Sequence, residues 1–296
     1  MDKKRALALT KLIIAMAIFS TIGAVVRSVS FPSGFSAMVR GFVGAVFIVG
    51  YMLVTGRRID FSGIKKNLII LLLSGGFIGI NWLLLFESYR FTTIATATVC
   101  YNVAPVFVIL LTPLVLRERV PLKKWICAIA AFVGITLVAD LLSFGKGNSP
   151  VAGVALALSA ALFYSFVTLS TKKMTGLSSY DITVVQLVAA SAVIAPYTAF
   201  VERVTLDMFD LTSVLLLLLL SVVHTGVAYL LYFSSVRELS SATVAVFTYI
   251  DPIGAVLISA FAFGEKMSPL GIVGTVIIFL SVLLSELDIQ FKRKNK

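Results

Sequence analysis

The stretch from Gly79 to Glu118, GINWLLLFESYRFTTIATATVCYNVAPVFVILLTPLVLRE, occurs twice in this chain. Shifted forward by 147 positions, it lies without a gap on Gly226 to Glu265, GVAYLLYFSSVRELSSATVAVFTYIDPIGAVLISAFAFGE. Apolar composition alone would pair many leucines, but it would not pair an arginine, a proline and a glutamate in one register: Arg90 with Arg237, Pro105 with Pro252, Glu118 with Glu265. Because the shift is about half of the 296 residues, the pattern indicates two copies of one unit.

The composition is that of a membrane protein. Hydrophobic residues make up 59% of the chain and charged residues only 13%, whereas a soluble domain of this size needs much more polar surface. A membrane-spanning helix takes roughly 20 apolar residues, so the length is sufficient for about ten spans.

Apolar runs separated by short polar breaks predict an all-α polytopic membrane protein with ten transmembrane helices. We place the spans at 11–29, 35–55, 67–89, 92–116, 124–142, 150–171, 180–200, 213–236, 240–263 and 269–286. The two repeats are then residues 1–146 and 147–296, and the short connections between the spans predict one compact bundle.

The distribution of lysine and arginine predicts the orientation. Basic residues are concentrated at the N-terminus, around 57–66, around 117–124, at 172–173 and in the C-terminal tail, which all fall on one side of the membrane. The positive-inside rule makes that side cytoplasmic, so we expect both termini in the cytoplasm and the protein in a cell membrane, the bacterial inner membrane. The net charge of +11 is thereby assigned to topology and lipid contact, and no basic-aromatic pattern points to nucleic acid.

Five spans per copy is an odd number, so the second copy enters the membrane upside down relative to the first. Inverted repeats are typical of secondary transporters, in which the two copies exchange conformations around a site near the middle of the membrane. The repeat therefore favours alternating access.

Two sets of short motifs, one in each copy, complete the pattern. The first copy has Phe86 to Arg90, Ala95-Thr96, Ala104-Pro105 and Leu116-Arg117-Glu118-Arg119, and the second has Phe233 to Arg237, Ala242-Thr243, Asp251-Pro252 and Phe263-Gly264-Glu265-Lys266. In these motifs the chain resembles the drug/metabolite transporter superfamily, specifically its ten-span EamA branch. The resemblance implies two inverted five-helix repeats, a cavity between spans 1, 3, 4, 6, 8 and 9, and export or exchange of small metabolites, often amino acids.

Asp251 is the leading candidate for binding or coupling, because ionisable side chains inside the membrane normally face a cavity or a partner. It lies halfway along its span and directly precedes Pro252, which cannot donate a backbone hydrogen bond. One interpretation is a proton- or cation-responsive carboxylate that contacts substrate. The other is a buried acid that stabilises the kink at the proline.

His224 is the only histidine and lies in the middle of span 8, so it can share the depth of Asp251. An imidazole beside a carboxylate suits proton coupling. A histidine satisfied by a serine or threonine of a neighbouring helix is the alternative.

Glu87, Arg40 and Arg27 fall near the outer ends of spans 3, 2 and 1. Together they predict an external ion pair that closes the cavity or captures a zwitterion, and Arg40 is the better binding candidate because it lies farthest inside its span. The alternative for the arginines is snorkelling of the charge to the membrane interface. We interpret Glu118 and Glu265 as anchors in short turns.

Pro105 and Pro252 are expected to kink spans 4 and 9 where the two repeats cross. Polar and aromatic residues surround them, as in cavities that accept small organic solutes. This candidate substrate-binding set contains Tyr101, Asn102, Thr248, Tyr249, Asn81, Trp82, Tyr229 and Tyr232. Each of these residues has packing between helices as its alternative role.

The leading hypothesis is a proton-coupled or facilitative exporter of a small metabolite such as an amino acid. Efflux of cationic amphiphilic drugs is the second transport hypothesis, and a membrane receptor or scaffold is the alternative outside transport. We do not expect an enzyme, a cofactor or a metal site, because the sequence has no nucleotide loop, metalloprotease motif or catalytic triad. The expected partners are a small-molecule substrate, the lipid bilayer and, under the coupled hypothesis, protons; both a monomer and a homodimer stay open.

Overall fold

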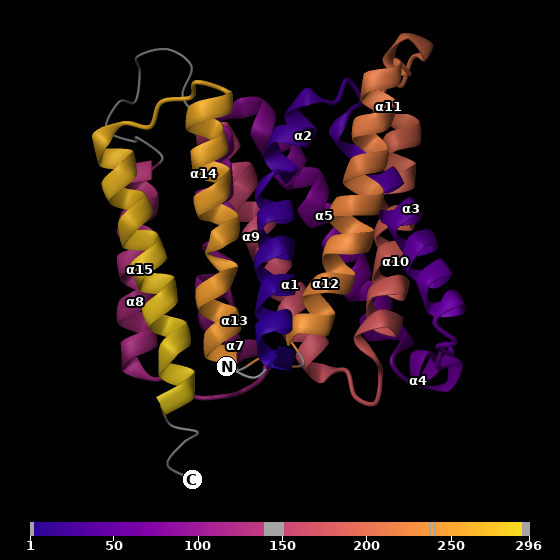
Figure 1. Cartoon of the computed structure of the whole chain (residues 1–296). Helices are drawn as coiled ribbons and strands as arrows, with labels where there is room; N and C mark the ends of the chain where they lie inside the picture. Colours follow the sequence, from indigo (N-terminus) through magenta and orange to yellow (C-terminus); the bar gives the residue numbers. More distant parts are fainter. Residues whose placement is uncertain (1–2, 139–150, 237, 240, 292–296) are drawn as a thin grey trace.

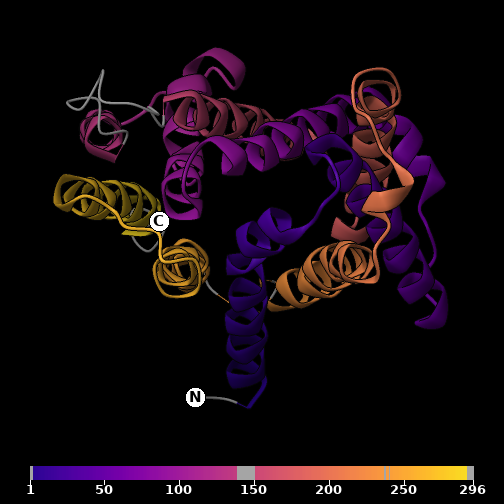
Figure 2. The same cartoon turned by 90° about the horizontal axis from the view of Figure 1, so that it is seen from above.

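The structure is a computed structural model that describes residues 3–138, 151–236, 238–239 and 241–291. It shows a bundle of roughly parallel helices (Figures 1 and 2). In chain order these are α1 (Lys3–Ser20), α2 (Ile22–Ser28), α3 (Ser33–Val54), α4 (Phe61–Lys66), α5 (Leu68–Phe91), α6 (Ile94–Tyr101), α7 (Ala104–Val115), α8 (Leu122–Val138), α9 (Val151–Lys173), α10 (Ser179–Phe200), η2 (Leu206–Met208), α11 (Leu211–Leu218), η3 (Leu219–Val227), α12 (Ala228–Val236), α13 (Ser241–Thr248), α14 (Ile250–Ala262) and α15 (Pro269–Phe291).

Among the described residues, seven helical stretches are long and apolar enough to cross a membrane. They are Lys3–Ser28, Ser33–Val54, Leu68–Phe91, Ile94–Val115, Val151–Lys173, Ser179–Phe200 and Leu211–Val236. Shorter apolar helices are found at Val246–Ala262 and Pro269–Ser285. Large apolar side chains such as Phe42, Ile69 and Phe261 are exposed, as expected where helices meet lipid. The predicted all-α, multi-pass membrane protein is confirmed.

Both ends of the described chain lie at the same end of the bundle. In Figure 1, α1 begins and α15 ends at the bottom, which we call the lower end; α11 begins at the opposite, upper end. The predicted boundary between the repeats, 146/147, lies outside the described residues.

The first helix corrects the sequence-based boundary. It begins at Lys3, eight residues before the predicted start of the first span, because lysine, arginine, alanine and leucine are strong helix formers even where they are too polar for hydrocarbon. The helix is then interrupted at Thr21, where the hydroxyl of Ser20 donates to the Ala17 carbonyl and that of Thr21 to the Ile18 carbonyl. Such bonds compete with the helical ladder and favour a bend.

Two of the predicted spans, 92–116 and 240–263, are broken at matched positions. In the first, α6 ends at Tyr101 and α7 begins at Ala104; in the second, α13 ends at Thr248 and α14 begins at Ile250. Each break is followed by its proline, Pro105 or Pro252, which lacks an N–H and clashes with the carbonyl four residues back. Figure 1 shows α7 toward the lower end and α14 toward the upper end, so the two broken helices run in opposite directions.

A π-helical segment, η3, replaces regular helix in the middle of the predicted span 213–236. Its wider turn places the Thr225 hydroxyl on the carbonyl of Leu220, five residues back. Segments of this kind are frequent at functional sites, and here it brings His224 and Thr225 into the core, where both are buried.

Glycines set the closest helix contacts. A Cβ on Gly79 of α5 would lie 2.8 Å from the Ala190 carbonyl oxygen of α10, and one on Gly134 of α8 would lie 2.8 Å from the Gly274 carbonyl oxygen of α15. The pair α8 and α15 stands side by side at one edge of the bundle (Figures 1 and 2). The remaining helices surround the centre.

Candidate substrate-binding site

Arg40 is a buried cation in the interior of the bundle. Arg40 lies on α3, and the residue is only 3% exposed. The Nε atom donates to the Thr225 hydroxyl at 2.7 Å, and the guanidinium lies over the Trp82 ring, 4.3 Å from its centroid. Gly44 makes this geometry possible, because a Cβ there would lie 2.6 Å from the Thr225 side chain.

The external ion pair that we predicted among Glu87, Arg40 and Arg27 is not formed by the described residues. The Glu87 carboxylate accepts a hydrogen bond from the Ser33 hydroxyl at 2.6 Å and lies 3.8 Å from Nε of Arg90. Arg40 has no carboxylate within ion-pair distance in the part of the chain that the structure describes. Arg40 and Glu87 do not pair because their side chains point in different directions. Arg40 turns inward toward Trp82 of α5, while Glu87 faces the upper end.

Asp251 is half-buried in the first turn of α14. It interacts electrostatically with Tyr89 of α5 and Tyr164 of α9. Tyr89 interacts in the same way with Arg40, so the two opposite charges act on one hydroxyl. The structure thus brings Asp251 and Arg40 to the same region without pairing them directly.

Tyr164 shows that this region contains accessible space. The residue is 44% exposed, yet its ring packs on Tyr101 of α6 at 5.8 Å and its hydroxyl interacts with Tyr229 and Tyr232 of α12. Its exposed surface therefore faces the interior of the bundle, between α9, α12 and α14. Tyrosine hydroxyls around an accessible interior are suited to hold a small polar solute.

The remaining predicted site residues are spread over several environments. Tyr229 packs on Phe19 at 5.7 Å and interacts with Arg40, and Tyr232 packs on Phe233. The amides of Asn81 and Asn102 donate to the carbonyls of Ala160 and Thr98. The Thr248 hydroxyl donates to the Val244 carbonyl, and the Tyr249 ring packs on Phe279 of α15, so these two residues lie beside the helix break rather than beside Arg40.

His224 has partners other than Asp251. Its Nδ1 lies 3.1 Å from the Leu219 carbonyl and its Nε2 lies 2.7 Å from the Thr21 hydroxyl. Since a carbonyl only accepts, Nδ1 donates to Leu219, and the ring's other contact is the Thr21 hydroxyl, whose one proton is directed to the Ile18 carbonyl. The imidazole thus joins η3 to the interruption between α1 and α2.

With this geometry in hand, the comparison with known proteins gives the family. The sequence profile of the EamA-like transporter family matches residues 6–139 and again residues 151–287. This chain belongs to the EamA-like transporter family.

Three relatives extend over most of the chain. The uncharacterized transporter YxxF of Bacillus subtilis is 28% identical over 289 residues, which are 96% of this chain and 91% of the relative. Protein PecM of Dickeya dadantii is 28% identical over 252 residues, covering 83% and 82%. Protein RarD of Salmonella typhi is 26% identical over 233 residues, covering 78% and 76%. One solved crystal structure has a TM-score of 0.64 at 14% identity over 97% of this chain and 98% of its own, which shows a shared fold.

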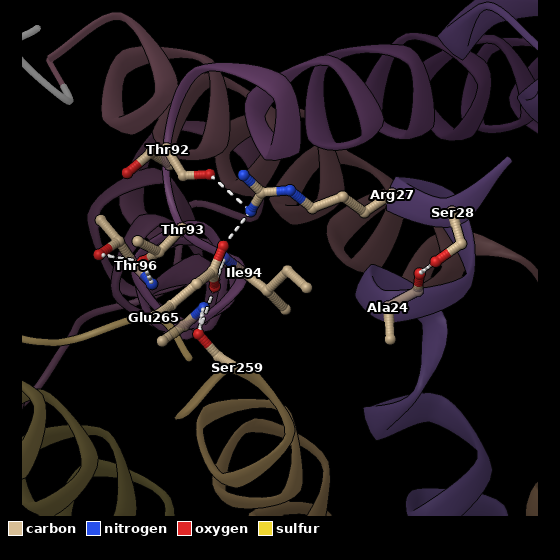
Figure 3. A network of polar contacts seen from close by, with 10 residues as sticks. Ala24, Arg27, Ser28, Thr92, Thr93, Ile94, Thr96, Ser259 and Glu265 are labelled. Carbon is tan, nitrogen blue, oxygen red and sulfur yellow. Dashed lines mark hydrogen bonds and ion pairs between the residues drawn. The ribbon is translucent and has the colours of Figure 1, made fainter. Parts of the chain in front are cut away.

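A polar network joins the two halves of this EamA-like chain at the upper end (Figure 3). The Glu265 carboxylate, which follows α14, forms an ion pair with Arg27 of α2. It also accepts hydrogen bonds from the backbone N–H of Ile94 at 2.9 Å and from the Ser259 hydroxyl. Arg27 donates in addition to the Thr92 carbonyl at 3.4 Å. Arg27 therefore forms its ion pair with Glu265 rather than with Glu87.

A second contact at the upper end uses the N-terminus of α3. Glu202, which follows α10, accepts hydrogen bonds from the backbone N–H groups of Gly34 at 2.7 Å and Phe35 at 2.8 Å. A carboxylate at a helix N-terminus satisfies free donors and interacts favourably with the helix dipole.

Both ends of the bundle have a pocket. One of about 480 Å³ lies at the upper end, lined by residues that include Phe35 and Glu202. Another of about 300 Å³ lies at the lower end between α1, α10 and α12, lined by residues that include Lys4, Arg57 and Tyr180. Lys4 and Glu238, which both line the lower pocket, form an ion pair at 2.9 Å with side chains that are 71% and 38% exposed.

Sequence reasoning missed Thr225, Tyr89 and Tyr164. Thr225 and Tyr89 carry no charge and stand in apolar runs, where a hydroxyl is unremarkable. The position of Thr225 beside Arg40 depends on the π-helical turn, for which the sequence has no reliable signal.

Proposed function

We propose that this protein is a secondary transporter that moves small organic metabolites by alternating access, and that amino acids or related metabolites are its substrates, exported from the cell. The observation that carries the proposal is the pair of opposite charges, Arg40 and Asp251, that both interact with Tyr89 inside a bundle of the EamA-like transporter family. Ionisable groups inside a membrane bundle typically mark a solute pathway.

The proposed architecture is ten spans in two inverted repeats, residues 1–146 and 147–296. The seven long helical stretches provide seven of these spans. Helix α8, the pair α13 and α14, and helix α15 provide the other three. Two observations support the duplication. The family profile matches once in each half, and Arg117 and Gly264, which are equivalent in the repeat register, both have left-handed backbone, with φ of 56° and 63°. The opposite directions of α7 and α14 support the inversion.

The lower end is the cytoplasmic end in this proposal. The basic connections around 57–66 and 172–173 lie there, as the positive-inside rule requires. The start of α1 and the end of α15 lie at the same end. The structure then represents a state in which the network around Glu265 closes the outer end.

Asp251 is the proposed coupling group. A half-buried carboxylate beside tyrosine hydroxyls can take up a proton as the site changes access, and protonation removes its attraction for a substrate ammonium group. The expected consequence is transport that responds to a pH gradient.

The decisive experiment is counterflow of labelled solutes in liposomes that contain the purified protein. A carrier accumulates label against preloaded unlabelled solute, whereas a channel, receptor, scaffold or enzyme does not. Acid pulses then test coupling. We expect Asp251→Asn to lose the pH response, and Asp207→Asn, the same change at an exposed carboxylate of η2, to retain it. An unaltered pH response in Asp251→Asn would contradict the coupling role.

Efflux of cationic amphiphilic drugs is the second candidate, because Asp251 and the surrounding tyrosines suit a lipophilic cation. Counterflow of quaternary ammonium compounds in preference to amino acids would favour it.

A further inference from the structure

Arg40 is a buried cation that forms no ion pair with a described residue. It lies within the span Ser33–Val54 and is 3% exposed. A buried cation is costly unless it is paired, and it is normally retained only where it serves a function. In the described part of the chain, the side chains that surround Arg40 supply no carboxylate within 4 Å.

The guanidinium also has donors to spare. It carries five N–H groups, and the hydrogen bond from Nε to Thr225 is the single one that it forms with the described residues. The faces of Trp82 and Phe86, 4.3 and 5.6 Å from the guanidinium carbon, attract the positive charge. They do not accept hydrogen bonds in the plane of the guanidinium, so the outer edge of the fork is left for another acceptor.

The surroundings of Arg40 connect it to the accessible interior. Its charge interacts with the hydroxyls of Tyr229, Tyr101 and Tyr89, which come from α12, α6 and α5. Tyr101 packs on Tyr164, whose exposed surface faces that interior. Arg40 and Asp251 therefore both interact with Tyr89, in the part of the bundle that contains Tyr101 and Tyr164.

We propose that Arg40 is a carboxylate-binding subsite, in which the guanidinium holds a carboxylate group of the solute while Trp82 forms one wall. This rests on the proposed transport function and narrows its substrates to compounds that carry a carboxylate, which excludes simple lipophilic cations. Arginine is suited to this role because its planar fork matches the two oxygens of a carboxylate. A carboxylate fits better than a phosphate dianion, because one guanidinium balances the single charge of a carboxylate.

Trp82 provides a direct readout. The chain has two tryptophans, and the other, Trp125 on α8, is removed by Trp125→Phe. In lipid nanodiscs, the fluorescence of Trp82 is titrated with acetate, propionate, benzoate and each of the standard L-amino acids. A carboxylate that displaces or neutralises the Arg40 guanidinium over the Trp82 ring should change the fluorescence emission. The change should saturate as the concentration of the carboxylate rises. The amide of each binding compound, which lacks the carboxylate charge, is then titrated as its match.

We expect at least one carboxylate to bind, its amide to bind at least about tenfold more weakly, and Arg40→Gln to lose the difference. Arg40→Lys keeps the charge without the fork and should retain part of it. Arg90→Gln, at an exposed arginine in the last turn of α5, is the matched control and should behave as the parent. If Arg40→Gln does not fold, the carboxylate-to-amide ratio in Arg40→Lys and in Thr225→Val replaces it, and both should be lowered.

Three results would overturn the subsite: no response of Trp82 to any of these carboxylates, equal binding of a carboxylate and its amide, or an unchanged ratio in the Arg40 variants. Counterflow separates this outcome from failure of the proposed function. Counterflow restricted to uncharged or cationic solutes overturns the subsite and leaves transport intact. Carboxylate binding that depends on Arg40 without counterflow of any solute supports the subsite and contradicts transport.

Discussion

Glu265 and Glu118 occupy the same position in the two copies of the repeat, and their surroundings are opposite. Glu265, at the upper end, is bound by Arg27, the backbone of Ile94 and Ser259 (Figure 3). Glu118 is exposed in the connection between α7 and α8, and no described residue forms a hydrogen bond or ion pair with it. One sequence motif therefore has a closed form and an open form within a single structure.

The difference between Glu265 and Glu118 indicates how the upper and lower ends would exchange their closed and open states. By the repeat register, Thr112 corresponds to Ser259 and the first turn of α13 corresponds to the first turn of α6, which contains Ile94. In the proposed inverted repeat, these groups would bind Glu118 when the lower end closes and Glu265 is released. Here Thr112 donates to the Val108 carbonyl of its own helix.

The largest effect is expected for Glu265→Gln, which removes the charge from the closed network. Hydrogen bonds to charged groups each contribute roughly 1.5–3 kcal/mol, so a loss of about 2 kcal/mol should shift the equilibrium toward the upper-open state about thirtyfold. The readout is the labelling rate of Val25→Cys, a buried position of α2, by a membrane-impermeant maleimide in a Cys100→Ala, Cys127→Ala background. Unchanged labelling would show that the network does not control access.

Arg27→Gln should act in the same direction and more weakly. The Arg27 side chain is 35% exposed, so solvent screens the ion pair and its loss should amount to about 1 kcal/mol, or about fivefold in Val25→Cys labelling. In the double variant with Glu265→Gln the two effects should be less than additive, because both remove the same pair. Full additivity would mean that the two side chains act separately.

Glu118→Gln should have a smaller effect of opposite sign. If Glu118 stabilises the lower-closed state, its loss should lower Val25→Cys labelling, by about threefold for a contact worth under about 1 kcal/mol. It is also the matched control for Glu265→Gln, since the chemical change is identical. Increased labelling would argue against the exchange of roles between the two carboxylates.

The smallest effect concerns the start of α11 at the upper end. The hydroxyl and backbone N–H of Ser213 hold the pKa of Asp210 below its ordinary value. A lowered folded-state pKa means that this cap stabilises the protein above the ordinary carboxyl pKa and is lost as pH falls through the lowered value. Thermal unfolding at decreasing pH should show this loss in the parent and not in Asp210→Asn. Parallel curves would indicate that the cap adds nothing to stability.

Much of the architecture was readable from local sequence properties. Spans such as 35–55 and 180–200 agree within two residues with α3 and α10, because twenty consecutive apolar residues have few alternatives to a membrane helix. The prolines marked the breaks between α6 and α7 and between α13 and α14, since a missing N–H acts wherever the proline lies.

The candidate site was less predictable. The sequence pointed to Arg40, Asp251, Trp82 and the tyrosines as candidates, but it did not give the partners of each charge. The sequence suggested Glu87 for Arg40, on the argument of similar depth. Depth does not specify which way a side chain points around its helix, and Arg40 points to Trp82 and Thr225.

The sequence by itself determined that this chain is an apolar, internally duplicated bundle of membrane helices, because span length and the repeated Arg, Pro and Glu pattern are properties of neighbouring residues. Only the tertiary structure decided that Glu265 binds Arg27 while Glu118 stays exposed, and that no carboxylate of the described residues pairs with Arg40. The physical reason is that these contacts join residues far apart along the chain, so they depend on helix rotation, on the π-helical turn of η3 and on which end of the bundle is closed.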